Sequence, residues 1–208
     1  TGKTTYGQTL AQHLNWNFLD LDDEIVRKTG KSVNEITKNG TDWQRFRQME
    51  FDLLQECTQL KNTVVGLGGG VGVNNIIKDG TDKTFGELET KFLHQIPNTL
   101  VILLTASEEV LNQRIWEKEM EKAENTRPIL CEQKAHETQQ KLKTHENNPQ
   151  KQKEIIVEAI IIDSIKMYES RKPLYANLTE NVVDTSEDVV EEVIDKIMKY
   201  HSNFKSSV

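Results

Sequence analysis

The sequence predicts an α/β fold in which short strands alternate with helices. The chain opens on a glycine-lysine-threonine segment followed by a helical pattern, as in the phosphate-binding loops of α/β proteins. Short apolar runs recur along the chain, each followed by a longer segment with helical spacing. One of these runs, Leu100–Leu104, is continuously apolar, as expected of a parallel strand covered on both faces.

The segment Thr1–Thr5 matches the second half of a phosphate-binding loop, G-x-x-x-x-G-K-[ST]. In such a loop, backbone N–H groups and the positive end of the following helix bind phosphate oxygens. Lys3 would then reach the β- and γ-phosphates, and the Thr4 hydroxyl would coordinate Mg²⁺. Three common residues also meet by chance in surface turns, so the motif needs support from the rest of the chain.

Length and composition predict a single domain over residues 1–208, with 36% hydrophobic and 28% charged residues. The net charge of -7 argues against general nucleic-acid binding, although a few arginines can still bind an anionic substrate locally. The most apolar run, Ile155–Ile162, is too short to span a bilayer. With only Cys57 and Cys131 no disulfide framework is expected, which favours a reducing compartment.

A helix over 4–15 and a strand over 18–22 are predicted after the loop. Alternation along the strand places Asp20 and Asp22 on the same side. In open α/β sheets, ligands bind beyond the carboxyl ends of the strands, so both carboxylates are expected near the phosphate loop. The alternative is a solvated edge or a helix N-cap.

Three helices are predicted next, and the third carries an apolar stripe interrupted by charged residues. Arg47 and Glu50 lie three residues apart there, a spacing that allows an ion pair to fix the guanidinium. Alternatively, Arg47 is a surface residue whose aliphatic stem packs on the core. The helices cover 23–28, 33–38 and 43–60, with breaks at Gly30 and Gly40.

The strand predicted over 63–67 runs directly into Gly68, Gly69 and Gly70. Glycines allow a ligand to approach the backbone closely, at a cost in conformational entropy. This run is therefore either a ligand-binding segment or a flexible loop.

The second half of the chain continues the alternation. Residues 126–152 are strongly polar, which predicts a mobile segment or an exposed helical hairpin. The other expected elements are a polar excursion over 74–97 with a short helix over 87–94, a strand over 100–104, a helix from its cap Ser107 to 124, a helix over 153–171 that Pro173 ends, a strand over 181–184, and a helix from its cap Ser186 to 200.

Six motifs occur in one order along nearly the whole chain: G-K-T-T, F-L-D-L-D, W-x-x-F-R-x-x-E, G-G-G after a strand, R-P-I-L, and R-x-P-L-Y before V-V-D-T-S. In this order they resemble the shikimate kinases, a P-loop family related to nucleoside-monophosphate kinases. The resemblance implies a three-layer fold with a parallel sheet of strand order 2-3-1-4-5 and helices on both faces. It also implies transfer of the γ-phosphate of ATP to the 3-hydroxyl of shikimate in aromatic amino-acid biosynthesis, with Mg²⁺ as cofactor.

The resemblance assigns a group of residues to ATP and its metal ion. Thr4 would hold Mg²⁺ directly and Asp20 would hold it through water. Arg114 matches the arginine that borders adenine. Arg127 matches the arginine of a lid, here about 125–153, that folds over the phosphates and excludes water. The residues assigned to ATP are Gly2, Lys3, Thr4, Thr5, Arg114 and Arg127, and those assigned to catalysis are Lys3, Asp22 and Arg127.

The resemblance also assigns residues to shikimate. Asp22 matches the aspartate that hydrogen-bonds the substrate hydroxyls and accepts a proton or orients the nucleophile. Arg47 and Arg171 match two arginines that bind the substrate carboxylate, a task suited to a planar, permanently charged fork. Glu50 would hold Arg47 in place. The backbone N–H groups of the glycine run, Gly68, Gly69 and Gly70, would face the same ligand.

Two features depart from the family pattern. The chain has apparent insertions over 78–97 and 131–153, the second within the lid. Neither a first strand nor the first glycine of the loop precedes Thr1, so we expect the sequence to be a fragment of a longer product. The 208-residue chain alone is then expected to be poorly stable and inactive, and a form extended by a strand plus G-x-x-G should regain both. Equal ATP turnover by the short chain would contradict this.

Two other functions stay open at this point. One is a kinase of another small sugar acid such as gluconate, because the paired arginines and the glycine run favour a carboxylated, polyhydroxylated ring but do not exclude an acyclic acid. A non-catalytic shikimate-kinase-like binding protein is the other, although Lys3, Asp22, Arg47 and Arg127 are all retained. We expect a monomer without nucleic-acid or membrane partners. It would lie in the cytoplasm, or in a plastid if a transit peptide precedes Thr1.

Overall fold

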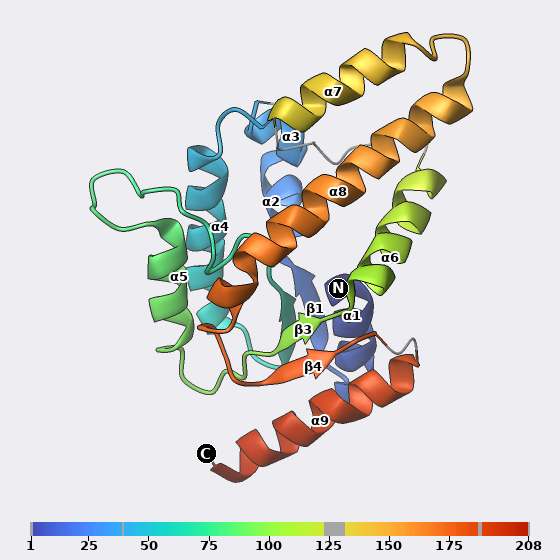
Figure 1. The fold of residues 1–208 in the computed structure, drawn as a ribbon. Coiled ribbons are helices and arrows are strands. Elements are labelled where there is room, and N and C mark those ends of the chain that lie inside the picture. Colours follow the sequence, from blue (N-terminus) through green and yellow to red (C-terminus); the bar gives the residue numbers. More distant parts are fainter. Residues whose placement is uncertain (1, 39, 123–131, 187–188, 208) are drawn as a thin grey trace. The chain divides into compact units, whose positions relative to one another are not determined.

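A computed structural model describes residues 2–38, 40–122, 132–186 and 189–207 (Figure 1). By their contacts these residues form two compact units. The first unit comprises Thr1–Thr105 with Pro173–Val208, and the second comprises Ala106–Lys172.

The first unit contains two pairs of parallel strands. β1 (Asn17–Asp20) pairs with β2 (Thr63–Gly66), and β3 (Leu103–Thr105) pairs with β4 (Val182–Asp184). No strand of the described residues joins one pair to the other. These pairs are compatible with strands 2 and 3 and strands 4 and 5 of the expected order 2-3-1-4-5.

Helices pack on both strand pairs of the first unit. α1 contacts β1, β2 and α9, while α2 and α5 contact α4. One hydrophobic cluster is built around α2 and α4 with Leu21, Phe46 and Leu54, and another around β4 and α9 with Val183 and Ile194. The helices of this unit are α1 (Lys3–Leu14), α2 (Leu21–Thr29), α3 (Val33–Ile36), α4 (Gln44–Glu56), the 3₁₀ helix η1 (Cys57–Gln59), α5 (Phe85–Leu93) and α9 (Val190–Ser207).

The second unit is helical. It contains α6 (Glu108–Glu121), α7 (Glu132–Lys143) and all but the last turn of α8 (Pro149–Tyr175). Figure 1 shows α8 returning alongside α7, which agrees with the predicted helical hairpin rather than a mobile segment for the residues described there. Ser107 caps α6 as predicted, since its hydroxyl oxygen accepts from the N–H of Val110 at 3.3 Å.

The structure corrects several predicted boundaries. The strand predicted to 22 ends at Asp20, because the Asp20 side chain accepts from the Asp22 N–H and starts α2. α8 continues through Pro173 to Tyr175. Ser186 does not cap the last helix, which begins at Val190; its hydroxyl donates to Asp184 instead. The strand predicted over 100–104 covers 103–105.

Within the part of the chain that the structure describes, every helix is either too short or too polar to cross a lipid bilayer.

Candidate functional site

The start of α1 has the backbone geometry of an anion-binding helix terminus. Gly2 caps the helix in the left-handed region, with φ 78°, and a Cβ there would lie 2.7 Å from the Tyr6 ring. Lys3, Thr4 and Thr5 form the first turn and are exposed. Because the N–H groups of a first turn have no acceptor within the helix, they can bind phosphate oxygens.

Asp20 joins this helix start to the end of β1. Its Oδ2 accepts from the Thr4 hydroxyl at 3.1 Å, and its Oδ1 accepts from the Asp22 N–H at 3.1 Å. Asp20 is therefore the N-cap of α2, which was one of the alternatives, and it also lies close to the start of α1, as predicted. The hydroxyl and the carboxylate are hard oxygen donors of the kind that Mg²⁺ prefers, so this pair fits the predicted metal ion.

Asp22 lies in the first turn of α2, where two cations, Lys3 and Arg47, act on its carboxyl. Burial raises the pKa of its carboxyl, and Asp20 raises it further, while Lys3 and Arg47 partly oppose the shift. A carboxylate with a raised pKa is a better proton acceptor near neutral pH than an exposed one. The Asp22 carboxyl is therefore close enough to be influenced both by the phosphate-binding segment, through Lys3, and by α4, through Arg47.

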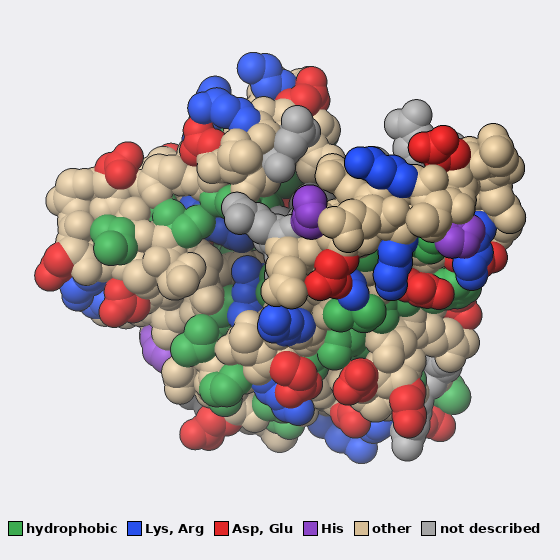
Figure 2. All heavy atoms as spheres, turned by 45° about the horizontal axis from the view of Figure 1, so that its top comes forward, with side chains coloured by type: hydrophobic (Ala, Val, Ile, Leu, Met, Phe, Trp, Pro, Cys, Tyr) green, Lys and Arg blue, Asp and Glu red, His purple; other side chains and the backbone are tan. Residues whose placement is uncertain are grey.

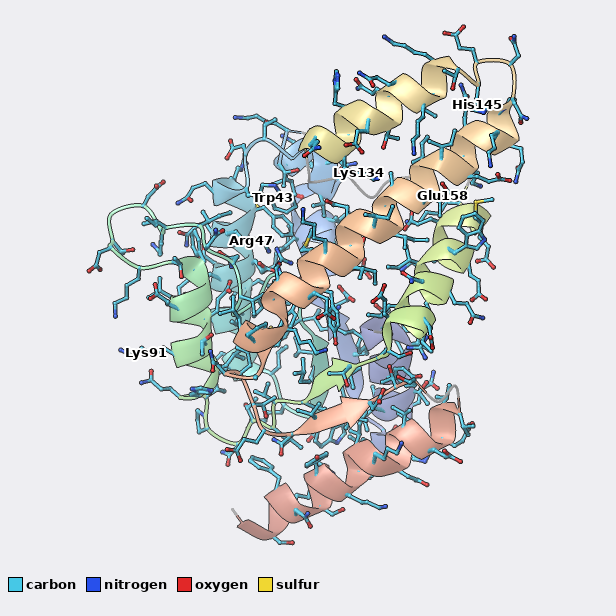
Figure 3. The ribbon with its side chains drawn as sticks, viewed as in Figure 1. Trp43, Arg47, Lys91, Lys134, His145 and Glu158 are labelled. Atoms are coloured by element: carbon cyan, nitrogen blue, oxygen red, sulfur yellow. The ribbon has the colours of Figure 1, made fainter. Side chains whose placement is uncertain are left out.

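Arg47 is a buried residue of α4. Its side chain is 8% exposed, and its Nη1 donates to Glu50 Oε2 at 2.5 Å, which confirms the predicted ion pair and excludes the surface alternative. The guanidinium carbon also lies 5.1 Å from the Trp43 ring centroid and 5.3 Å from that of Phe46. Figure 3 shows Trp43 at the start of α4, where it is the N-cap residue, and Arg47 one turn farther along. These contacts fix the orientation of the planar fork.

The glycine run lies against this ion pair. A Cβ on Gly70 would collide with the Arg47 guanidinium, and one on Gly68 would collide with Glu50 and lie 3.0 Å from Asp22 Oδ1. A Cβ on Gly69 would have open space around it. The Tyr175 hydroxyl donates to the Gly69 carbonyl at 2.6 Å. The run is therefore held in place, which does not fit a flexible loop.

A second buried carboxyl, Glu89 of α5, lies beyond the glycine run. It accepts from the Gly72 N–H at 2.7 Å and from the Asn74 side-chain amide at 3.2 Å. Burial, followed by the charge of Glu50, raises the pKa of Glu89 to about 8. The sequence analysis missed this residue. The available signal was a glutamate on the apolar face of the helix, four residues from both Phe85 and Leu93.

Three predicted arginines are not placed with these residues. Arg114 and Arg171 belong to the second unit. Arg127 lies outside the described residues. The residues brought together by the first unit are Thr4, Asp20, Asp22, Arg47 and Gly68–Gly70.

Charged side chains of both signs are interspersed on the face of the molecule seen in Figure 2. This mixture agrees with the modest net charge of -7.

Comparison with known proteins finds relatives among the shikimate kinases. A sequence model described as "Shikimate kinase" matches residues 1–201. The shikimate kinase of Enterococcus faecalis is 31% identical over 199 residues, covering 95% of this chain and 90% of that protein. The shikimate kinase of Chlorobium limicola is 45% identical over 75 residues, covering 36% of this chain and 37% of that protein.

A solved structure of similar fold is the shikimate kinase of Acinetobacter baumannii in complex with shikimate. It has a TM-score of 0.67 at 23% sequence identity, over 97% of this chain and 87% of that one. This likeness supports the P-loop kinase fold predicted from the motifs.

The collision at Gly70 gives a matched pair of variants. Gly70→Ala forces Arg47 away from Glu50, and we expect it to lower the free energy of unfolding by about 1–3 kcal/mol, as overpacking of a buried site does. Gly69→Ala adds the same methyl group into open space and should change stability little. Chemical denaturation of both variants measures this, and equal destabilisation would contradict the described contact.

Proposed function

The chain belongs to the shikimate kinase family, and we propose that it transfers the γ-phosphate of ATP to the 3-hydroxyl of shikimate. The observation that carries this proposal is the position of Asp22. Its carboxyl lies against Gly68, and it is acted on by Lys3 from the phosphate-binding segment and by Arg47 from α4. We call the side of Lys3 the phosphate end of the site and the side of Arg47 its substrate end. A carboxyl between a cation for phosphate and a cation for a substrate carboxylate suits phosphoryl transfer to a hydroxy acid.

At the phosphate end, the first turn of α1 would bind the β- and γ-phosphates, with Lys3 neutralising the group being transferred. Thr4 and Asp20 would hold Mg²⁺, the second through water. Bound with ATP, Mg²⁺ would neutralise charge that develops on the phosphate oxygens.

At the substrate end, Arg47 would bind the carboxylate of shikimate as a bidentate partner. Glu50 and the two aromatic rings fix its fork, so little side-chain entropy is lost on binding. Gly69 and Gly70 would add backbone N–H groups. Asp22 would accept the proton of the 3-hydroxyl or orient that oxygen for attack.

The remaining roles rest on the family resemblance. Arg127 would lie over the phosphates in a lid of about 125–153, Arg114 would border adenine, and Arg171 would be the second arginine for the substrate carboxylate. A monomer in the cytoplasm completes the proposal, and the low number of cysteines agrees with a reducing compartment.

A coupled assay of ADP release tests the activity in both forms described above, the chain alone and the form extended ahead of Thr1. From the extended form we expect shikimate-dependent turnover and little with gluconate, because an acyclic acid offers its hydroxyls to Asp22 less favourably. Turnover with gluconate alone would favour another sugar-acid kinase. Shikimate binding without turnover in either form would favour a binding protein.

Asp22→Asn tests the assigned proton acceptor. We expect kcat to fall by about 10²–10⁴-fold, as for loss of a general base, while ATP affinity stays nearly unchanged. Asp23→Asn, on the exposed neighbour, is the matched control. Since the carboxyl acts when ionised and its pKa is raised, the acid limb of the kcat/KM profile should lie above the usual aspartate range. Normal turnover by Asp22→Asn would overturn the role.

A further inference from the structure

α5 holds the backbone just beyond the glycine run from two sides. Glu89 accepts from the Gly72 N–H at 2.7 Å, and the next residue, Thr90, donates its hydroxyl to the Gly72 carbonyl at 3.1 Å. Asn74 connects the two regions, because its side-chain amide donates to Glu89 at 3.2 Å and to the Gly70 carbonyl at 3.1 Å. The peptide at Gly72 is thus fixed through both its donor and its acceptor.

These bonds lead directly to the substrate end of the site. The Gly70 carbonyl also accepts from the Val73 N–H at 3.2 Å, so the segment from Gly70 to Asn74 forms one hydrogen-bonded turn. Gly70 contacts the Arg47 guanidinium. A shift of the turn therefore moves the backbone that lies against the carboxylate-binding arginine.

Packing does not explain why residue 89 carries a carboxyl group. It is 0% exposed on the apolar face of α5, and its Oε1 is buried with no hydrogen-bond partner among the described residues. Burial of a polar group without full pairing is costly, and methionine or leucine would fill the same space. The partners that it does have belong to the glycine turn.

We propose that Glu89 is a positioning residue of the substrate site: its carboxyl holds the Gly72 peptide and the Asn74 amide, and through them keeps Gly70 against Arg47. The role in substrate binding rests on the proposed function. The role in holding the turn does not.

The charge state of Glu89 adds a second effect. With a pKa of about 8, raised first by burial and then by Glu50, its carboxyl is mostly uncharged at neutral pH. Glu50 and Arg47 are the charged groups of α4 that act on it, and residues 68–74 contribute none. On α5 itself, Glu87 is exposed and Lys91 points away from α4 (Figure 3).

An uncharged Glu89 leaves the Arg47–Glu50 pair electrically balanced, whereas an ionised Glu89 adds a negative charge close to this pair. An anionic substrate should therefore bind less tightly as the pH rises through about 8. Glutamine keeps an acceptor for Gly72 and cannot ionise, so it separates this effect from the loss of the hydrogen bonds.

The experiment measures the shikimate dissociation constant by calorimetry for the unmodified protein, Glu89→Gln, Glu89→Met and the control Glu87→Gln. At about pH 7 we expect Glu89→Met to bind about tenfold more weakly, the effect of one or two lost hydrogen bonds, and Glu89→Gln to bind normally. Between about pH 7 and pH 9 the unmodified protein should weaken severalfold and Glu89→Gln should not. Glu87→Gln alters only the helix cap and should follow the unmodified protein.

Hydrogen exchange of the amides of residues 70–74 provides a readout that needs no substrate. It should become faster in Glu89→Met and stay unchanged in Glu87→Gln. Unchanged exchange in Glu89→Met, or unchanged shikimate affinity in both Glu89 variants at every pH, overturns the proposal. If neither the chain alone nor the extended form binds shikimate, the proposed function fails, and exchange alone decides whether Glu89 holds the turn. If Glu89→Met does not fold, the pH dependence of Glu89→Gln decides.

Discussion

The buried ion pair between Arg47 and Glu50 is the interaction on which the rest of the site depends. Removing one partner of such a pair leaves an uncompensated buried charge and costs about 3–5 kcal/mol. The neighbouring features follow from it. Gly68 and Gly70 lack side chains where the pair lies against the backbone, two aromatic rings flank the guanidinium, and the charge of Glu50 helps to keep Glu89 protonated.

Local spacing predicted the parts of the site that depend on a single helix or on the order of elements. The three-residue separation of Arg47 and Glu50 predicted their pairing, and the order of loop, helix and strand predicted the approach of Asp20 to Thr4. The same reasoning was wrong about where the strand ends. Alternation of side chains cannot show that Asp20 accepts a hydrogen bond from the Asp22 N–H and thereby ends the strand. Asp22 therefore lies in the first turn of α2 and not in the strand.

Contacts between distant segments were beyond prediction from one sequence. The bond from Tyr175 to Gly69 joins residues 106 positions apart, and nothing in the spacing of either segment indicates it. Glu89 lies in a stretch interpreted as an insertion, and only its place on an apolar face distinguished it. The roles of Arg114, Arg127 and Arg171 rest on motif order alone.

Pro173 makes one turn of the long helix α8 easier to bend than the others. Proline has no N–H, so the carbonyl of Glu169 lacks its usual partner in the helix, and the boundary between the two compact units falls at this proline. Bending of α8 should therefore cost least at this turn. Two residues later the Tyr175 hydroxyl donates to the Gly69 carbonyl, so α8 is tied to the glycine run just beyond the turn that bends most easily.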